Sequence, residues 1–179
     1  ATDFDNDGDI DLHISHCRQG VNSSTDCRRW DRLFVNDGNG NYTDDAASYG
    51  MENREQVWTT DFGDYDNDGD LDAFSTTHSS TLMLFENDGT GHFTNVTAGS
   101  GLEISGFFLQ AKMEDMDNDG FLDILTGSAE HFFKGHGDGT CAGPGRLRAG
   151  RASADTENHG HAGAGAIRLP NDRAADKVC

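Results

Sequence analysis

Three short segments of the chain repeat one acidic pattern, Asp-x-Asp-x-Asp-Gly-x-x-Asp, and they begin at Asp3, Asp64 and Asp115. Carboxylates at positions 1, 3 and 5 can curl around one point, and the glycine at position 6 permits a sharp turn. Position 7 offers its backbone carbonyl and position 9 closes the shell, which suits the oxygen ligands that calcium prefers. We therefore expect about three Ca²⁺ ions, one in each loop. The expected metal ligands are Asp3, Asp5, Asp7, Asp9, Asp11, Asp64, Asp66, Asp68, Asp70, Asp72, Asp115, Asp117, Asp119, Phe121 and Asp123.

Other interpretations of these loops explain fewer of their residues. An EF-hand needs Glu at position 12, where this chain has Ile14, Ser75 and Thr126. Zinc is disfavoured because the loops contain no Cys or His, whereas magnesium prefers a tighter octahedron. Asp, Asn and Gly are also common in plain turns. Three copies in register, each with carboxylates that repel one another by several kcal/mol without a cation, favour the metal.

A second motif, Asn-Asp-Gly-x-Gly-x-aromatic, begins at Asn36 and Asn87, and a weaker copy begins at Gly135. The distance from each acidic segment to the following Gly-rich motif is 33, 23 and 20 residues. The distance from a Gly-rich motif to the following acidic segment is 28 residues both times. Asn-Asp-Gly between alternating apolar runs is a hairpin signal. The runs expected to be strands in the second repeat are 57–62, 71–76, 81–85 and 92–97. Four short strands in about 50 residues are the content of one propeller blade.

The acidic segments and the Gly-rich motifs together resemble the FG-GAP/VCBS repeat family of integrin-α-like propellers and secreted proteins. The resemblance includes Asp61-Phe62-Gly63, which precedes the second acidic segment. The resemblance implies β-propeller blades with calcium in a hairpin loop of each, and roles in adhesion, glycan binding or scaffolding. It does not imply one activity.

The fold expected from the residues and the resemblance is all-β, with about three blades of four antiparallel strands at about 1–50, 51–101 and 102–140. These repeats span 1–140, and a Gly/Ala/Arg-rich tail at 141–179 is expected to be loop-like or weakly docked. The first acidic segment lacks the strand that should precede it, and three motifs are fewer than a closed propeller needs. We therefore expect a blade set that is incomplete or completed by other chains, since open sheet edges invite pairing.

The charge of the chain excludes several partners. The net charge is −19, with 27 acidic and 6 basic residues in 1–133 against 5 and 7 in 134–179. Such acidity disfavours nucleic acids and anionic membrane surfaces. No run approaches the ~18 apolar residues of a membrane helix, so we expect no membrane insertion. No signal peptide is visible, and the first residues have the character of a mature or truncated end.

Cysteines and sequons favour an extracellular protein, secreted or on the cell surface. Cys17 and Cys27 lie in a stretch that makes the first repeat ten residues longer than the second, and we expect them to form a disulfide. Cys141–Cys179 follows by elimination, and unrelated thiols are the alternative. The sequons predict glycosylation at Asn22, Asn41 and Asn95.

No motif of a catalytic nucleophile, zinc protease or phosphate loop occurs, and we expect no enzyme activity. The leading hypothesis is a calcium-binding extracellular module that binds a glycan or protein ligand. The alternative is a structural subunit that self-associates into oligomers or fibres through open sheet edges. A weaker alternative is the non-catalytic repeat region of a secreted enzyme.

Overall fold

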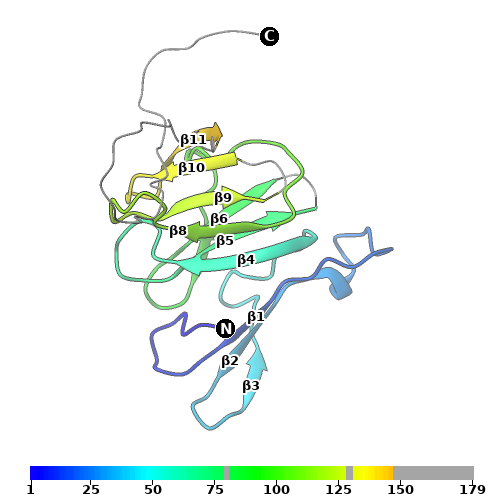
Figure 1. Ribbon diagram of the computed structural model, residues 1–179. Coiled ribbons are helices and arrows are strands. Elements are labelled where there is room, and N and C mark those ends of the chain that lie inside the picture. Colours follow the sequence, from blue (N-terminus) through cyan, green and yellow to red (C-terminus); the bar gives the residue numbers. More distant parts are fainter. Residues whose placement is uncertain (79–80, 128–130, 147–179) are drawn as a thin grey trace, which may run out of the picture.

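Three antiparallel sheets make up the computed structural model, which describes residues 1–78, 81–127 and 131–146 (Figure 1). The first sheet contains β1 (Leu12–Ile14), β2 (Arg32–Asn36) and β3 (Tyr42–Asp44). The second contains β4 (Val57–Gly63), β5 (Asp72–Thr77), β6 (Leu82–Asn87) and β7 (Phe93–Asn95). The third contains β8 (Ala111–Glu114), β9 (Asp123–Thr126), β10 (His131–Gly135) and β11 (Cys141–Arg146).

The second and third sheets are four-stranded meanders in which sequence neighbours pair, with the orders β4-β5-β6-β7 and β8-β9-β10-β11. The first sheet has three strands in the order β1-β2-β3, and no described strand corresponds to β4. The all-β class and the four-stranded unit are thus confirmed. β1, β5 and β9 are equivalent, because each follows an acidic segment and pairs with the strand that ends at the Gly-rich motif.

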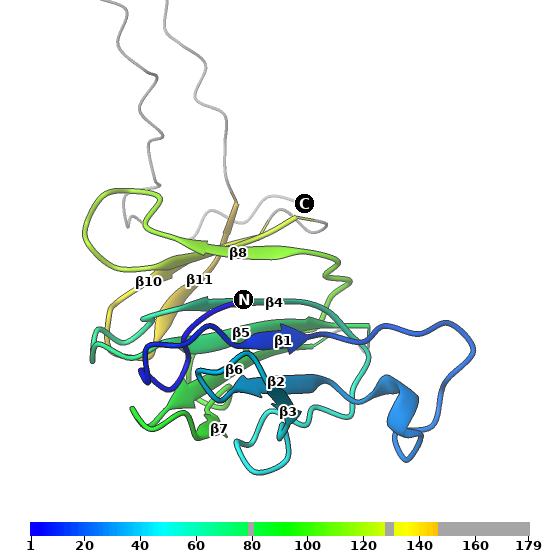
Figure 2. The same ribbon diagram turned by 90° about the horizontal axis from the view of Figure 1, so that it is seen from below.

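The hydrophobic core lies between neighbouring sheets. One buried cluster joins the second and third sheets and includes Tyr65, Phe74 and Phe133, whereas the other joins the first two and includes Phe4 and Leu33. In Figure 2, β4 lies between β1 and β8, and residues of β4 and β8 are in contact. Each sheet therefore buries its apolar side chains against the next one, as blades of a propeller do.

The ends of consecutive repeats are joined by repeated backbone hydrogen bonds. The N–H of Phe93 donates to the carbonyl of Tyr49 at 2.9 Å, and the N–H of Cys141 donates to the carbonyl of Ser100 at 2.8 Å. The last strand of one blade is thereby held by the chain that leaves the previous blade. This arrangement fixes where the loops of one blade meet the hairpins of the next.

Two local features add to the expectations. A 3₁₀ helix, η1 (Cys27–Arg29), lies in the longer first repeat and is capped by the side chain of Asp26, which accepts from the Arg28 N–H. β11 lies in the segment expected to be loop-like or weakly docked, and it pairs with β10 along the third sheet. None of the helices in the described ranges is long and apolar enough to cross a membrane.

Candidate metal centres

Each acidic segment forms a loop that leads into the second strand of its blade, and special backbone angles shape it. The asparagine at position 4 (Asn6, Asn67 and Asn118) has φ of 58°, 64° and 62°. The glycine at position 6 has φ of 93°, 101° and 94° in the three loops. Asparagine tolerates the left-handed region and glycine adopts it without steric cost, so the repeated Asn-Asp-Gly fits this curl.

Carboxylates of the loop also hold its own backbone. The position 1 carboxylate accepts the N–H of the position 6 glycine at 3.1 Å in the first loop, 3.2 Å in the second and 2.9 Å in the third. The position 5 carboxylate accepts the N–H of position 7 at 2.9 Å, 3.0 Å and 3.0 Å. Each bond occupies one carboxylate oxygen of the accepting side chain, and in the third loop the other oxygen of Asp115 accepts the N–H of Asp119 at 3.1 Å. The loop backbone is thus held by its own acidic side chains.

The position 9 aspartates, Asp11, Asp72 and Asp123, clamp the loop to the neighbouring strand. They are buried, with 0%, 2% and 0% exposure. Each accepts the backbone N–H of the last residue of β2, β6 or β10. The donors are Asn36 at 2.8 Å, Asn87 at 3.0 Å and Gly135 at 3.0 Å. A single residue thus serves the loop and the sheet at once, which fixes the register between them.

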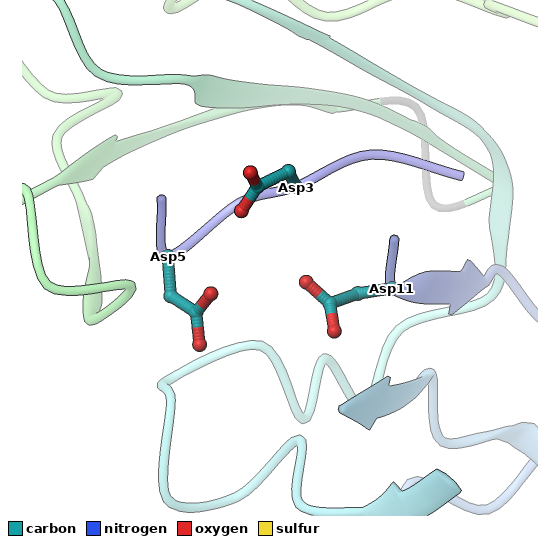
Figure 3. Close-up of side chains that lie close together, drawn as sticks. All are labelled: Asp3, Asp5 and Asp11. Atoms are coloured by element: carbon teal, nitrogen blue, oxygen red, sulfur yellow. The ribbon is translucent and has the colours of Figure 1, made fainter. Parts of the chain in front are cut away.

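Three carboxylates converge in each loop. Oxygens of Asp3, Asp5 and Asp11 lie within 4.8 Å of one another, and Figure 3 shows these carboxylates turned toward a common centre. The second and third loops bring together the same positions, 1, 3 and 9, and these residues are Asp64, Asp66, Asp72, Asp115, Asp117 and Asp123. Positions 5 and 7 are not in these clusters. Each cluster therefore contains three of the expected carboxylate ligands. The backbone carbonyl expected at position 7 stays a prediction.

The remaining positions have other contacts. Asp7, Asp68 and Asp119 at position 5 accept the N–H of the residue two places on. At position 7, the Asp70 side chain accepts from the Asn6 amide at 2.9 Å. This bond joins the first loop to the second, which sequence spacing alone does not reveal.

Unpaired oxygens show that the loops suit a cation. Asp3 Oδ1, Asp11 Oδ2, Asp64 Oδ1 and Asp117 Oδ1 are buried and have no hydrogen-bond partner. A carboxylate only accepts, so a buried unpaired oxygen needs either a donor or a positive ion. All-oxygen donor sets of this kind fit a hard divalent ion such as Ca²⁺. The acidic side chains of positions 1, 3 and 9 would hold it.

Several of the clustered acids have a raised pKa, which is the direction expected of ligands without their ion. Burial raises the pKa of Asp72 to about 6, although the Asn87 and Tyr65 N–H groups counteract it. Burial also raises the pKa of Asp11 and Asp123. For Asp66, burial and the charge of a neighbouring aspartate both raise the pKa. A cation at the centre would reverse these shifts by favouring the charged carboxylates.

The third loop contains an ammonium group that sequence analysis did not identify. The Lys134 Nζ donates to Asp117 Oδ2 and, at 2.5 Å, to Asp119 Oδ2. These hydrogen bonds raise the pKa of Lys134, and the bond from Lys134 lowers the pKa of Asp119. The signal in the sequence was weak, because Lys134 follows its partners by 17 and 15 residues.

Asn87 is a second residue whose role was missed. It was assigned only to a hairpin turn, yet its side chain is 1% exposed and donates to the Phe4 carbonyl at 2.8 Å. The first Asp loop is thereby tied to the second blade. The Asn-Asp-Gly motif carried this signal, since a turn alone does not require a buried asparagine.

The cysteine prediction is not met by the structure. Cys17 and Cys27 are free thiols, and Cys17 lies within hydrogen-bonding distance of Gln56 Oε1, at 3.7 Å. Cys141 is also free and buried, and Cys179 lies outside the described residues. A disulfide requires close Cα atoms, and the fold of the inserted segment decides that distance. The sequon residues Asn22, Asn41 and Asn95 are all exposed, and their glycosylation stays a prediction.

Comparison with known proteins identifies the repeat. A family model described as FG-GAP-like repeat matches residues 3–75 and again 64–126, so the two matches span the three acidic loops. No curated protein matches the chain. Together the matched segments cover more than half of the 179 residues. The chain belongs to the FG-GAP-like repeat family, whose repeats form β-propeller blades.

Proposed function

We propose that the chain is a calcium-stabilised, non-catalytic module of an extracellular protein that binds a glycan or protein ligand. The observation that carries the calcium part is the set of four buried, unpaired carboxylate oxygens in the three loops. Leaving these oxygens bare costs roughly 1–3 kcal/mol each, and a bound ion removes that cost. Calcium that binds the folded chain alone stabilises it by mass action.

Support for ligand binding comes from a cavity of about 470 Å³ beside the second sheet. Trp58 and His78 line it and stack on each other, with ring centroids 5.6 Å apart and an interplanar angle of 29°. Trp58 is 36% exposed. The polar residues that line the same cavity include Gln19, Asn22 and Gln56. An exposed aromatic face beside side-chain amides suits a sugar ring and its hydroxyls.

Support for an extracellular location is the family itself, since FG-GAP repeats are typical of extracellular proteins. Extracellular calcium is abundant enough to fill sites of modest affinity. The charge of −19 also fits a protein that relies on cations for its fold.

The calcium proposal is tested by metal analysis and calorimetry on the purified chain, with melting followed with and without a chelator. Asp66→Asn changes a clustered carboxylate, and Asp88→Asn makes the same change in the exposed hairpin turn after β6. We expect Asp66→Asn to remove one calcium ion per chain and to reduce the rise in melting temperature that calcium produces. Asp88→Asn should change neither. A chain that binds no calcium, or that melts at the same temperature with and without the chelator, would sink the proposal.

Ligand binding is tested on a glycan array with the calcium-loaded chain and with Trp58→Ala. Signal on a defined set of sugars that the variant loses supports the cavity. Binding that survives Trp58→Ala would place the ligand elsewhere on the surface.

Self-assembly is a second candidate, favoured by one strand. Within the described residues β1 pairs only with β2. Three apolar side chains on and beside it are exposed, with Ile10 at 52%, Leu12 at 37% and Ile14 at 43%. An unpaired edge with alternating apolar residues is a template for another strand. Light scattering decides: oligomers that Ile14→Lys dissolves support assembly, and a monomer at all concentrations contradicts it.

A further inference from the structure

The third acidic loop already holds a positive charge from its own blade. The Lys134 ammonium, on β10, contacts the carboxylates of both Asp117 and Asp119. Asp117 belongs to the carboxylate cluster of that loop, and its other oxygen is one of the buried unpaired atoms. One carboxylate is thus shared between an internal cation and the predicted metal centre.

The other two blades place different residues at the position of Lys134. Lys134 precedes Gly135, whose N–H donates to the position 9 aspartate. The residues that make this same bond in the first and second blades are Asn36 and Asn87, so the equivalents of Lys134 are Val35 and Glu86. The three loops therefore meet a neutral, an acidic and a basic side chain at one register position.

Glu86 acts on the second loop in the direction opposite to Lys134. It lines one small pocket together with Asp66 and Asp72, and its charge contributes to raising the pKa of Asp66. The second loop also has Asp70 at position 7, where the third loop has Phe121. The second loop is consequently the most acidic of the three and the third is the least.

We propose that Lys134 is a built-in counter-ion of the third loop, so that this loop holds its shape without calcium and binds calcium most weakly of the three. This ranking rests on the proposed calcium function. A calcium ion that enters the third loop must displace the ammonium from Asp117 or tolerate it nearby. Repulsion between a divalent ion and an ammonium at ~4 Å, even at the dielectric constant of water, weakens binding roughly tenfold or more.

Two exchanges of charge test the proposal. Lys134→Met keeps an unbranched side chain without the charge, and Lys134→Arg keeps the charge as a control. Glu86→Lys moves an ammonium to the equivalent position of the second loop. Calcium binding is followed by calorimetry and by the amide NMR signals of Gly8, Gly69 and Gly120, each of which lies at position 6 of one loop.

In the unchanged protein, the amide signals of Gly8 and Gly69 should shift at calcium concentrations roughly tenfold or more below the concentration that shifts the Gly120 signal. Lys134→Met should bring the Gly120 response into the range of the other two, whereas Lys134→Arg should not. Glu86→Lys should weaken the Gly69 response and leave Gly8 unchanged. Equal affinities at all three loops, or a Gly120 response that Lys134→Met leaves in place, would overturn the ranking.

The counter-ion role has a separate readout that needs no calcium. The Gly120 N–H donates to Asp115 at 2.9 Å, so its hydrogen exchange reports the shape of the third loop. In chelator, Lys134→Met should speed exchange at Gly120 several-fold and leave Gly69 unchanged. No change at Gly120 would refute the counter-ion role. Absence of calcium at every loop would instead refute the proposed function and the ranking with it.

Discussion

Replacing Asn87 by alanine removes a buried amide that joins two blades. Its Nδ2 donates to the carbonyls of Phe4, in the first acidic loop, and Leu71, at 2.8 Å and 3.1 Å. Its Oδ1 accepts the N–H groups of Gly89 and Gly91 at 3.2 Å and 2.9 Å. All four polar groups of the backbone lose their partner in the variant.

The size of the effect follows from these four bonds. A hydrogen bond contributes about 1 kcal/mol, and a buried group left without a partner costs about 1–3 kcal/mol. Because Asn87 is 1% exposed, water does not readily replace its amide. We therefore expect Asn87→Ala to lower the free energy of unfolding by about 3–4 kcal/mol.

Asn36 supplies a matched control, because it starts the equivalent motif of the first blade. Its side chain is only half-buried, and its amide donates to the carbonyl of Ile10 at 3.3 Å. Its Oδ1 accepts the Gly38 N–H at 3.2 Å. Since water can reach these groups, we expect Asn36→Ala to cost only about 1 kcal/mol.

Urea unfolding at saturating calcium, followed by circular dichroism, measures both variants. The reasoning is refuted if the two substitutions cost the same within about 0.5 kcal/mol, which is the usual error of such comparisons. It is also refuted if Asn87→Ala costs less than Asn36→Ala. Either result would mean that the bond to Phe4 does not join the blades in solution.

Two further predictions concern a glycine and an acid. Gly101 and Gly99 have nearly the same φ, 89° and 88°, but a Cβ at Gly101 would lie 2.3 Å from the Cys141 carbonyl oxygen, whereas a Cβ at Gly99 would meet no atom within 4 Å. Thermal melting should therefore show that Gly101→Ala destabilises the protein by at least about 2 kcal/mol more than Gly99→Ala. Burial raises the pKa of Asp31 to about 8, so its contribution to stability is present below pH ~4 and is lost as the pH rises through 8. The Asp31→Asn variant keeps an acceptor for the His16 N–H. In urea unfolding, its free energy of unfolding should therefore rise relative to that of the unchanged protein by up to about 1.4 kcal/mol per pH unit between about pH 5 and pH 8. Plots of unfolding free energy against pH that run parallel for the two proteins would contradict this.

The parts of the fold that could be predicted from the sequence are those held by hydrogen bonds between residues of one short motif, which recurs along the chain. The acidic segments specify their own backbone, because Asn67 and Gly69 take the left-handed angles and Asp64 accepts the Gly69 N–H within the same loop. The interval of 28 residues from each Gly-rich motif to the next acidic segment, seen twice, likewise indicated where the next blade begins. Hydrogen bonds between residues close in sequence need no distant partner, so the spacing of the residues is enough to predict them.

The parts that sequence missed depend on contacts between distant segments. Asn87 meets Phe4 across 83 residues, and Lys134 reaches Asp117 only because β10 pairs with β9 in one register. The expected disulfide failed for the same reason. The segment that carries Cys17 and Cys27 forms a 3₁₀ helix and other turns, and their geometry is not encoded in the spacing of the two cysteines.

The contacts between blades imply that calcium bound as proposed would act beyond the loop that holds it. The first loop is held against the second blade by the bond from Asn87 to Phe4 and by the bond from Asn6 to Asp70. Ordering the first loop around an ion therefore also orders one face of the blade boundary, where the cluster around Phe4 and Leu33 is buried. Because the described sheets bury apolar side chains against their neighbours, we expect removal of calcium to loosen this boundary as well as the carboxylate cluster. We therefore expect the proposed calcium binding at the first loop to be coupled to the packing of the first two blades, so that a variant that weakens either should weaken both.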